Sequence, residues 1–468
     1  MKLFIVLSLL SLNLFAFDEL DLNPNADKSV SKYRKIINNF MDLNLYYPAI
    51  PLIKEYFVLN KGNAVHEDVE RAIEKVITNI GVKQFEFLPE EILKASRSEV
   101  VKYVLAKKYF KRGEYDRAIQ ETTLIPSSHY ISPFALNIAA SAYSILGRSK
   151  EAITTFGTCV ERSRNSYSKM KDENQRTQLE INQDYCQIGI ARTHFAEKNF
   201  EEAEMKYLDI PKSSYIWPET LFEEAWNSFY LKNFNRTLGK LVTYKAPVFD
   251  YVFNPEIDIL NTLTYMELCL WSDVKRSVDN FYEQYEKPSE YVAKFIADAK
   301  ENYQLYFKLA IDRRTKEVEG NELFNKILKS IIRDPTFNEM VDAYFLGEKE
   351  YATISGWKTS RLKEFATENL RESLKLQRDL IGSYVKRNMS LKFSQLDNAF
   401  SQMSYIKLEV LSRRKNEIYS FQADPTIKRG DVQYLKRNEK QYFWTFNGEF
   451  WADEIGDYVF ALKSECVK

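Results

Sequence analysis

Hydrophobic positions between residues 98 and 288 recur at three- and four-residue steps in short segments that come in pairs, with a turn inside each pair. This spacing is typical of amphipathic helices that bury one face. Helical patterns also cover 29–97 and 289–356. The 468 residues include only 14 Gly and 13 Pro, too few for the turn density of an all-β protein. The pattern therefore predicts an all-α fold.

Four positions of the first helix pair return 34 residues later in the second pair. Ala106, Tyr109, Gly113 and Ala118 recur as Ala140, Tyr143, Gly147 and Ala152. Small residues let antiparallel helices approach closely, and a glycine can end the first helix in a left-handed conformation. This offset and order of residues resemble the tetratricopeptide repeat (TPR). The resemblance implies a TPR-like α-solenoid over 98–288.

Three further repeats follow at changing offsets. Repeat three, with Ala191 and Ala203, lies 51 residues after repeat two, and repeat four, with Ala225, returns to 34. Repeat five keeps little of the signature and lies 37 residues after repeat four. The charged stretch SRNSYSKMKDENQRTQLEINQ before repeat three predicts that the two flanking helices are extended. Residues 29–97 have the rhythm of the repeats without their signature, as expected of an N-terminal helical cap.

The stretch 357–422 predicts one long amphipathic helix, since it has no proline and its apolar residues keep helical spacing. Such a helix needs a partner surface, because intrinsic propensity does not hold an apolar stripe in water. It could pair with itself as a coiled coil or lie across other helices of the chain. The irregular, aromatic stripe favours the second arrangement.

The last segment, 423–468, changes character. Asn447-Gly448 lies between two aromatic runs, which predicts a β-hairpin, and the alternating segment 457–463 could add a strand. The spacing WxFxGExWxDExGxY, from Trp444 to Tyr458, resembles the tail of exported TPR proteins from gliding and predatory deltaproteobacteria. That resemblance implies a role in a cell-envelope complex.

The N-terminus predicts export. Residues 1–16 have a lysine, an apolar run and a small residue, which is the pattern of a secretory signal peptide, and 17–28 is a polar lead-in. No later stretch reaches membrane-spanning length without charges, so we expect a periplasmic chain without an integral membrane segment. The balance of 66 basic against 66 acidic residues argues against nucleic acid as a partner.

The sequence contains no recognisable catalytic or metal-binding pattern. Its three histidines are dispersed, its four cysteines match no zinc pattern, and no catalytic motif or phosphate-binding loop is present. We therefore expect no enzyme, no metal and no cofactor. An oxidising compartment permits a disulfide between Cys159 and Cys186, which flank the insertion before repeat three. Cys269 and Cys466 are left unpaired.

The TPR resemblance implies that the first helix of each pair lines a concave groove. The predicted partner-binding residues are Tyr103, Lys107, Phe110, Phe134, Asn137, Tyr185, Arg192, Phe195, Phe222, Trp226 and Phe229. The same phasing also places Lys111, Ser141, Ile188 and Tyr230 in the groove. This lining is aromatic and has few cations, unlike the clamp with which related proteins hold a C-terminal carboxylate. It would suit an apolar helix or an extended segment. The long helix of 357–422 could also fill the groove itself.

Two functions remain open at this point. The first is a non-catalytic periplasmic scaffold that binds protein partners of a cell-envelope complex through the aromatic groove. The alternative is a peptidoglycan- or carbohydrate-binding or enzyme-accessory protein that uses a tail site of Trp444, Glu449, Trp451 and Asp453. The same residues are more simply explained as a solvated hairpin edge whose tryptophans are buried against the solenoid. The pattern does not specify the partner or the oligomeric state.

Overall fold

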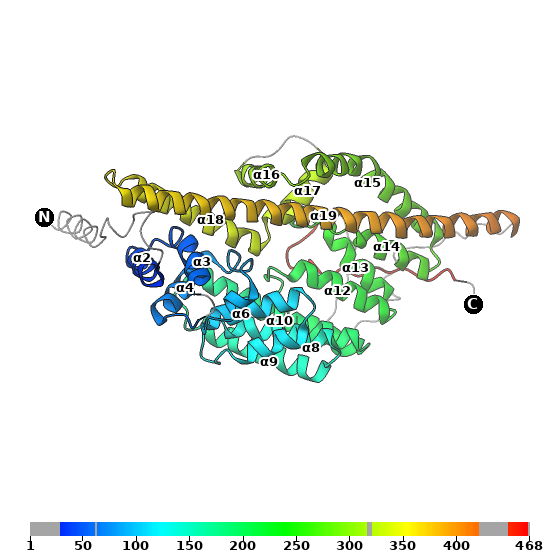
Figure 1. The fold of residues 1–468 in the computed structure, drawn as a ribbon. Coiled ribbons are helices and arrows are strands. Elements are labelled where there is room, and N and C mark those ends of the chain that lie inside the picture. The colour runs from blue at the N-terminus through cyan, green and yellow to red at the C-terminus, as the bar shows by residue number, and fades with distance from the viewer. Residues whose placement is uncertain (1–28, 61–62, 316–320, 421–447, 467–468) are drawn as a thin grey trace. The chain divides into compact units, whose positions relative to one another are not determined.

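In the computed structural model of the chain, the described residues are 29–60, 63–315, 321–420 and 448–466 (Figure 1). They form helices and connecting segments, with no β-strand among them. The predicted signal peptide and polar lead-in lie outside these residues. The all-α prediction is confirmed.

The chain divides into two compact units. The first comprises residues up to 146, 302–308 and 334–384, and the second comprises 147–301, 309–333 and 385 onward. The helices in chain order are α2 (Val30–Asp42), α3 (Ala49–Asn60), α4 (Glu67–Ile80), α5 (Glu90–Leu93), α6 (Glu99–Lys111), α7 (Tyr115–Thr123), α8 (Ser132–Ile145), α9 (Ser149–Tyr167), α10 (Glu173–Ala196), α11 (Phe200–Tyr207), α12 (Trp217–Tyr230), α13 (Phe234–Val242), α14 (Glu256–Glu267), α15 (Trp271–Ala299), α16 (Tyr303–Thr315), α17 (Glu322–Ile332), α18 (Pro335–Ser355) and α19 (Arg361–Ser420).

The turns inside the helix pairs share one backbone conformation. A residue with positive φ follows the first helix at Gly113 (78°), Gly147 (72°), Lys198 (63°), Lys232 (59°) and Cys269 (57°). These positions are 34, 51, 34 and 37 residues apart, which are the offsets that the sequence pattern predicts.

The hydrogen bonds of these turns recur as well. Asn233 N donates to Ser228 O at 2.8 Å, and Leu270 N donates to Tyr265 O at 2.9 Å. Glu114 and Asn199 make the equivalent bonds to Tyr109 and His194. A bond from the residue after the left-handed position to the carbonyl five residues earlier defines a Schellman helix end. The small signature residues are all 0% exposed: Ala106, Ala118, Ala140, Ala152, Ala191, Ala203, Ala225 and Thr237.

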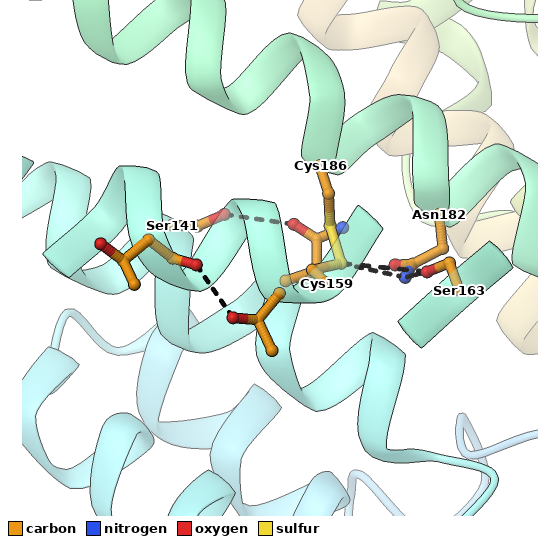
Figure 2. Close-up of a disulfide and its surroundings, with 8 residues drawn as sticks. Ser141, Cys159, Ser163, Asn182 and Cys186 are labelled. Atoms are coloured by element: carbon orange, nitrogen blue, oxygen red, sulfur yellow. Dashed lines mark hydrogen bonds between the residues drawn. A yellow bond between two sulfur atoms is a disulfide. The ribbon is translucent and has the colours of Figure 1, made fainter. Parts of the chain in front are cut away.

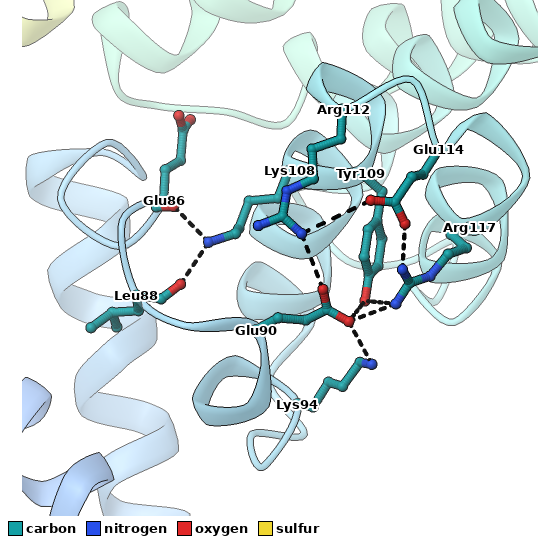
Figure 3. A network of polar contacts seen from close by, with 9 residues as sticks. All are labelled: Glu86, Leu88, Glu90, Lys94, Lys108, Tyr109, Arg112, Glu114 and Arg117. Carbon is teal, nitrogen blue, oxygen red and sulfur yellow. Dashed lines mark hydrogen bonds and ion pairs between the residues drawn. The ribbon is translucent and has the colours of Figure 1, made fainter.

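The N-terminal helices dock on the first repeat through a polar network around Glu90 (Figure 3). Its carboxylate accepts hydrogen bonds from Tyr109 Oη at 2.7 Å and from Arg117 at 2.6 Å, and it pairs with Lys94 at 2.7 Å. Bonds from Lys94 and Tyr109 outweigh desolvation and lower the pKa of Glu90 to about 2. The signature tyrosine of repeat one thus also fixes the cap.

The long helix α19 packs on other helices of the same chain. In the first unit its residues Leu370 and Leu374 join the core that contains Phe40 and Val100. Gln377 Nε2 donates to the Met340 carbonyl at 2.9 Å. In the second unit Val385, Met389 and Leu396 are 0% exposed, and Phe400 lies edge to face with Phe281 of α15, ring centroids 5.1 Å apart. This burial explains the irregular apolar stripe.

The charged insertion forms the end of α9 and the start of α10. A disulfide joins Cys159 of α9 to Cys186 of α10, and both residues are 0% exposed. Beside it, Asn182 Nδ2 donates to Ser163 Oγ at 3.0 Å (Figure 2). Gly189 lets the two helices approach, because a Cβ there would lie 2.5 Å from the Phe156 ring.

Three expectations need correction. Cys269 and Cys466, left unpaired above, form a second disulfide. The predicted boundary at 288/289 falls inside α15, which continues through Pro288. No strand forms in 448–466, and the first arm of the predicted hairpin, 441–447, lies outside the described residues. Residues 458–462 instead run along α13, and 464–466 lie at the end of α14. Asn235 and Leu268 hold the backbone of Phe460, Leu462 and Glu465 through hydrogen bonds.

Candidate protein-binding surface

Three of the predicted groove residues pair with a second aromatic ring across the turn of their own repeat. Phe110 meets Tyr115 with centroids 5.4 Å apart, and Phe195 meets Phe200 at 5.5 Å. Phe229 meets Phe234 at 5.5 Å in the same edge-to-face geometry. Each pair brackets a left-handed residue, so these phenylalanines close the turn as part of the repeat architecture.

In the second unit two of these pairs merge into one cluster around Tyr230. Its ring stacks on Phe200, with centroids 5.1 Å apart and planes 5° apart, and lies 5.9 Å from Trp226 and 5.5 Å from Phe195. Tyr230 is nevertheless 50% exposed. We call Phe195, Phe200, Trp226, Phe229, Tyr230 and Phe234 the aromatic cluster. In this cluster the ring of Tyr230 is exposed to solvent on one side and packs on other aromatic rings on the opposite side.

The other predicted rings of the second unit support neighbouring cores. Tyr185 packs beside a core that includes Ile188 and Trp217. Phe222 and Trp226 pack against Ala225, Leu241 and Leu260. All these rings are half-buried. The α12 face therefore holds its aromatic side chains in defined positions.

Arg192 is not a free cation for a ligand. Its guanidinium contacts both oxygens of Glu223, with the Nε atom 3.0 Å from each, and its Nη2 lies 2.6 Å from Glu219 Oε1. Burial opposes the charge, but the bonds to Glu223 outweigh it and raise the pKa of Arg192 above its usual value. Two carboxylates thus balance this one cation, so Arg192 does not offer free positive charge to an anionic group.

The predicted residues of the first unit are likewise engaged. Tyr103 and Phe134 pack beside Ile125 and Ile131. Lys107 Nζ lies 3.3 Å from Glu86, at a site that Lys83 and Lys111 also approach. Burial would raise the pKa of Glu86, but Lys107, Lys83 and Lys111 outweigh it and hold the pKa at about 2. The half-buried Asn137 accepts a long bond of 3.5 Å from Ser141.

The predicted tail site is only partly described, because Trp444 lies outside the described residues. Trp451 is 60% exposed, and Glu449 and Asp453 are also exposed. Lys212 Nζ donates to the Asp453 carbonyl at 3.2 Å and pairs with Asp457 at 2.7 Å. The negative charge of Asp457 in the tail is therefore balanced by Lys212, which lies in the segment between repeats three and four.

The described residues contain neither a metal-binding group nor a membrane-spanning helix. No group of three or more His, Cys, Asp or Glu side chains is placed to hold a metal ion. In the same part of the chain, no helix combines the length and the apolar character needed to cross a bilayer.

The prediction from sequence missed two of the six rings of the aromatic cluster. Phe200 and Phe234 were not among the predicted groove residues, and both belong to the second helices of their pairs. The available signal was the five-residue interval between rings, which occurs as Phe110–Tyr115, Phe195–Phe200 and Phe229–Phe234 at equivalent repeat positions. Glu219 and Glu223, which neutralise Arg192, lie on the first helix of the next repeat.

Comparison with known proteins adds context for the fold. No family model and no curated protein matches this chain. Among solved structures, TPR-like repeats of a kinesin light chain from Podospora anserina match with 14% identity, 39% coverage of this chain, 92% of that chain and a TM-score of 0.24. A Rap protein complexed with competence and sporulation factor has 12% identity, 76% and 100% coverage and a TM-score of 0.28.

A circular tandem repeat protein has 10% identity, 82% and 78% coverage and a TM-score of 0.16. These scores are too low to support an argument about function. The assignment depends on the chain's own geometry: buried small residues, Schellman turns and left-handed positions at the predicted offsets. Residues 99–299 therefore form helix-turn-helix repeats of the tetratricopeptide type.

Proposed function

We propose that this chain is a non-catalytic scaffold that binds a protein partner through the aromatic cluster. The observation that carries the proposal is Tyr230, which is half exposed although its ring rests on Phe200, Trp226 and Phe195. A ring that is already fixed loses little conformational entropy when a partner covers it. Tyrosine and tryptophan are also the side chains that contribute most at protein interfaces.

The charges around the cluster indicate the chemistry of the partner. Because Arg192 is paired with Glu219 and Glu223, it is not free to hold a terminal carboxylate. The rings of the aromatic cluster suit an apolar helix face or an extended apolar segment. We infer that the partner presents such a segment, with leucine-like or aromatic side chains against Tyr230 and Trp226.

We further propose that the scaffold acts in a periplasm, within a cell-envelope complex. The signal-like residues 1–16 support export. The two disulfides support it independently, because such bonds persist in oxidising compartments and are rare in the cytosol. Fractionation of the source cells tests this point: recovery of the chain with both disulfides in the periplasmic fraction is expected, and recovery as a cytosolic thiol protein would contradict it.

A photo-crosslinking amino acid placed at position 230 tests the surface directly. We expect it to capture a discrete protein partner in the source cells, whereas the same group at the exposed Tyr405 of α19 captures none. Trp226→Ala should reduce the capture at 230 at least tenfold while leaving the circular dichroism unchanged. Equal capture from positions 230 and 405 would reject the aromatic cluster as the binding surface.

The glycan-binding alternative has one observation in its favour, the exposed Trp451. Exposed aromatic rings can stack on sugars, but Lys212 already engages the neighbouring Asp457. Sedimentation with purified peptidoglycan separates the two functions. The scaffold stays in the supernatant with or without Trp451→Ala, whereas a glycan binder sediments and loses this property in the variant.

A further inference from the structure

The C-terminal tail lies against α13 as a peptide ligand lies in a binding site. Asn235 of α13 bonds both backbone groups of Leu462: its Oδ1 accepts from Leu462 N at 3.0 Å, and its Nδ2 donates to Leu462 O at 3.1 Å. The Asn235 carbonyl also accepts from Phe460 N at 3.1 Å. Further along, Leu268 O accepts from Glu465 N at 2.9 Å. This recognition of main chain does not depend on the tail's side chains.

Gly239 supplies the space for the tail backbone. A Cβ at this position would lie 1.6 Å from the Tyr458 carbonyl oxygen. Any residue larger than glycine at position 239 would therefore displace the tail. The equivalent positions of repeats one, two and three are Gln120, Thr154 and Met205, all exposed. Met205 is 60% exposed. The repeat fold itself therefore accepts a side chain here, and the glycine of repeat four serves the tail.

Two apolar side chains of the tail provide selectivity. Phe460 and Leu462, two residues apart in an extended segment, both pack on Leu238, Leu268 and Leu270. Alternate residues of an extended chain point to the same side, so this face selects an aromatic and an aliphatic residue at that spacing. We call Asn235, Leu238, Gly239, Leu268 and Leu270 the tail-binding face.

The second disulfide closes the end of this face and is accessible. Cys466 is exposed and Cys269 is half-buried, whereas Cys159 and Cys186 are both 0% exposed. A dithiol reductant can therefore attack the Cys269–Cys466 bond first. The exchange passes through a mixed disulfide, after which the second thiol of the reductant closes its own disulfide and leaves two protein thiols.

We propose that the tail-binding face is a second peptide-binding site, next to the aromatic cluster, whose Phe234 packs on the same leucines. It takes an extended segment of the type Phe-x-Leu followed four residues later by cysteine, and the chain's own tail is its resident ligand. Thiol–disulfide exchange with a dithiol reductant at Cys269–Cys466 releases the tail and makes the face available to the same type of segment from another chain.

A labelled peptide of residues 456–466 with Cys466→Ser tests the proposal on the full-length protein. It is titrated by fluorescence anisotropy into the millimolar range, because a tethered tail competes at an effective concentration of that order. We expect binding to the dithiol-treated chain, and to a Cys466→Ser chain, at least tenfold tighter than to the oxidised chain. A peptide with Phe460→Ser and Leu462→Ser should bind at least tenfold more weakly.

The matched variants are Gly239→Leu and Gly157→Leu in the Cys466→Ser chain. Gly157 is also helical, and a Cβ there meets nothing within 4 Å, so its variant should bind the peptide as the parent does. Gly239→Leu should lose at least tenfold in affinity with its helical content retained. Equal binding by these two variants, equal binding by oxidised and reduced chains, or no binding at all would overturn the proposal. Covalent dimers joined through Cys269 and Cys466 would support it.

Discussion

Phe110 and Tyr115 meet edge to face across the turn at Gly113, with their ring centroids 5.4 Å apart. The pair belongs to the first unit and has no part in the aromatic cluster around Tyr230, so its contribution to folding can be measured separately from binding. Its equivalents in repeats three and four also belong to the proposed binding surface.

Removing one ring of this pair should destabilise the fold. Tyr115→Ala is expected to lower the free energy of unfolding by about 1–2 kcal/mol, since it loses an edge-to-face contact and part of its buried area. Urea titration followed by circular dichroism measures the change. Tyr405→Ala, at a 75% exposed position, is the control and should have no measurable effect. Equal stability of the two variants would show that the ring pair is dispensable.

A glycine at Lys232 should stabilise the protein. Lys232 adopts a φ of 59°, a conformation that costs an L-residue about 1–2 kcal/mol and costs glycine almost nothing. Part of this gain is offset by the greater entropy of glycine in the unfolded chain, so we expect a net gain of about 0.5–1 kcal/mol. Thermal unfolding checks the sign, and Gly147→Ala should shift the midpoint the opposite way.

The buried Glu350 should make stability depend on pH. Its oxygens accept hydrogen bonds from Tyr46 N at 3.1 Å and Tyr47 N at 2.9 Å. Burial nevertheless raises its pKa to about 7 from the usual 4.5. Between these values the folded state holds more protons than the unfolded state, so stability falls as the pH rises from 4.5 to 7.

Glu350→Gln removes this titration. The change in unfolding free energy between pH 4.5 and 7 should shrink by up to roughly 3 kcal/mol in the variant, the equivalent of the pKa difference. Urea midpoints across this range provide the measurement. Asp342→Asn, at an exposed position of the same helix, should keep the parental slope. A Glu350→Gln slope identical to that of the parent would contradict the assignment.

The buried disulfide should contribute to stability through the chain that it closes. Cys159 and Cys186 are 27 residues apart, and releasing a loop of this size is expected to cost about 3.5 kcal/mol. The double variant Cys159→Ala, Cys186→Ala should therefore unfold at lower urea concentration. Protection of the α9 and α10 amides against hydrogen exchange should fall with it. Unchanged protection would mean that Asn182, Ser163 and the packing of Phe156 on Gly189 suffice.

Most of the fold could be predicted because its determinants are local and periodic. The small residues at Ala106 and Ala140 and the turn glycines set the register, and the register continued to repeat five. In repeats three, four and five the turn glycine is replaced by Lys198, Lys232 and Cys269, so a search for glycine alone would miss these turns. The long helix could be predicted from the spacing of its apolar residues, since residues three and four apart share one face of a helix.

The binding surface could be predicted only in part. The pattern placed Arg192 and Phe229 on first helices, but it did not show that Glu223 neutralises one and that Phe234 engages the other. The contacts of the tail depend on pairs such as Asn235 and Leu462, which are 227 residues apart. No period relates such positions, so the second disulfide and the role of Gly239 emerged only from the structure.

The left-handed turn residue offers a route to covalent engineering. In repeat five it is a cysteine whose side chain reaches a passing segment, whereas repeats three and four carry solvent-facing lysines in the same conformation. Cysteines introduced at Lys198 and Lys232 would repeat that anchoring geometry at one-repeat intervals. The solenoid would then have a row of cysteines to which thiol-bearing molecules can be attached through disulfides, and its interior would not be disturbed.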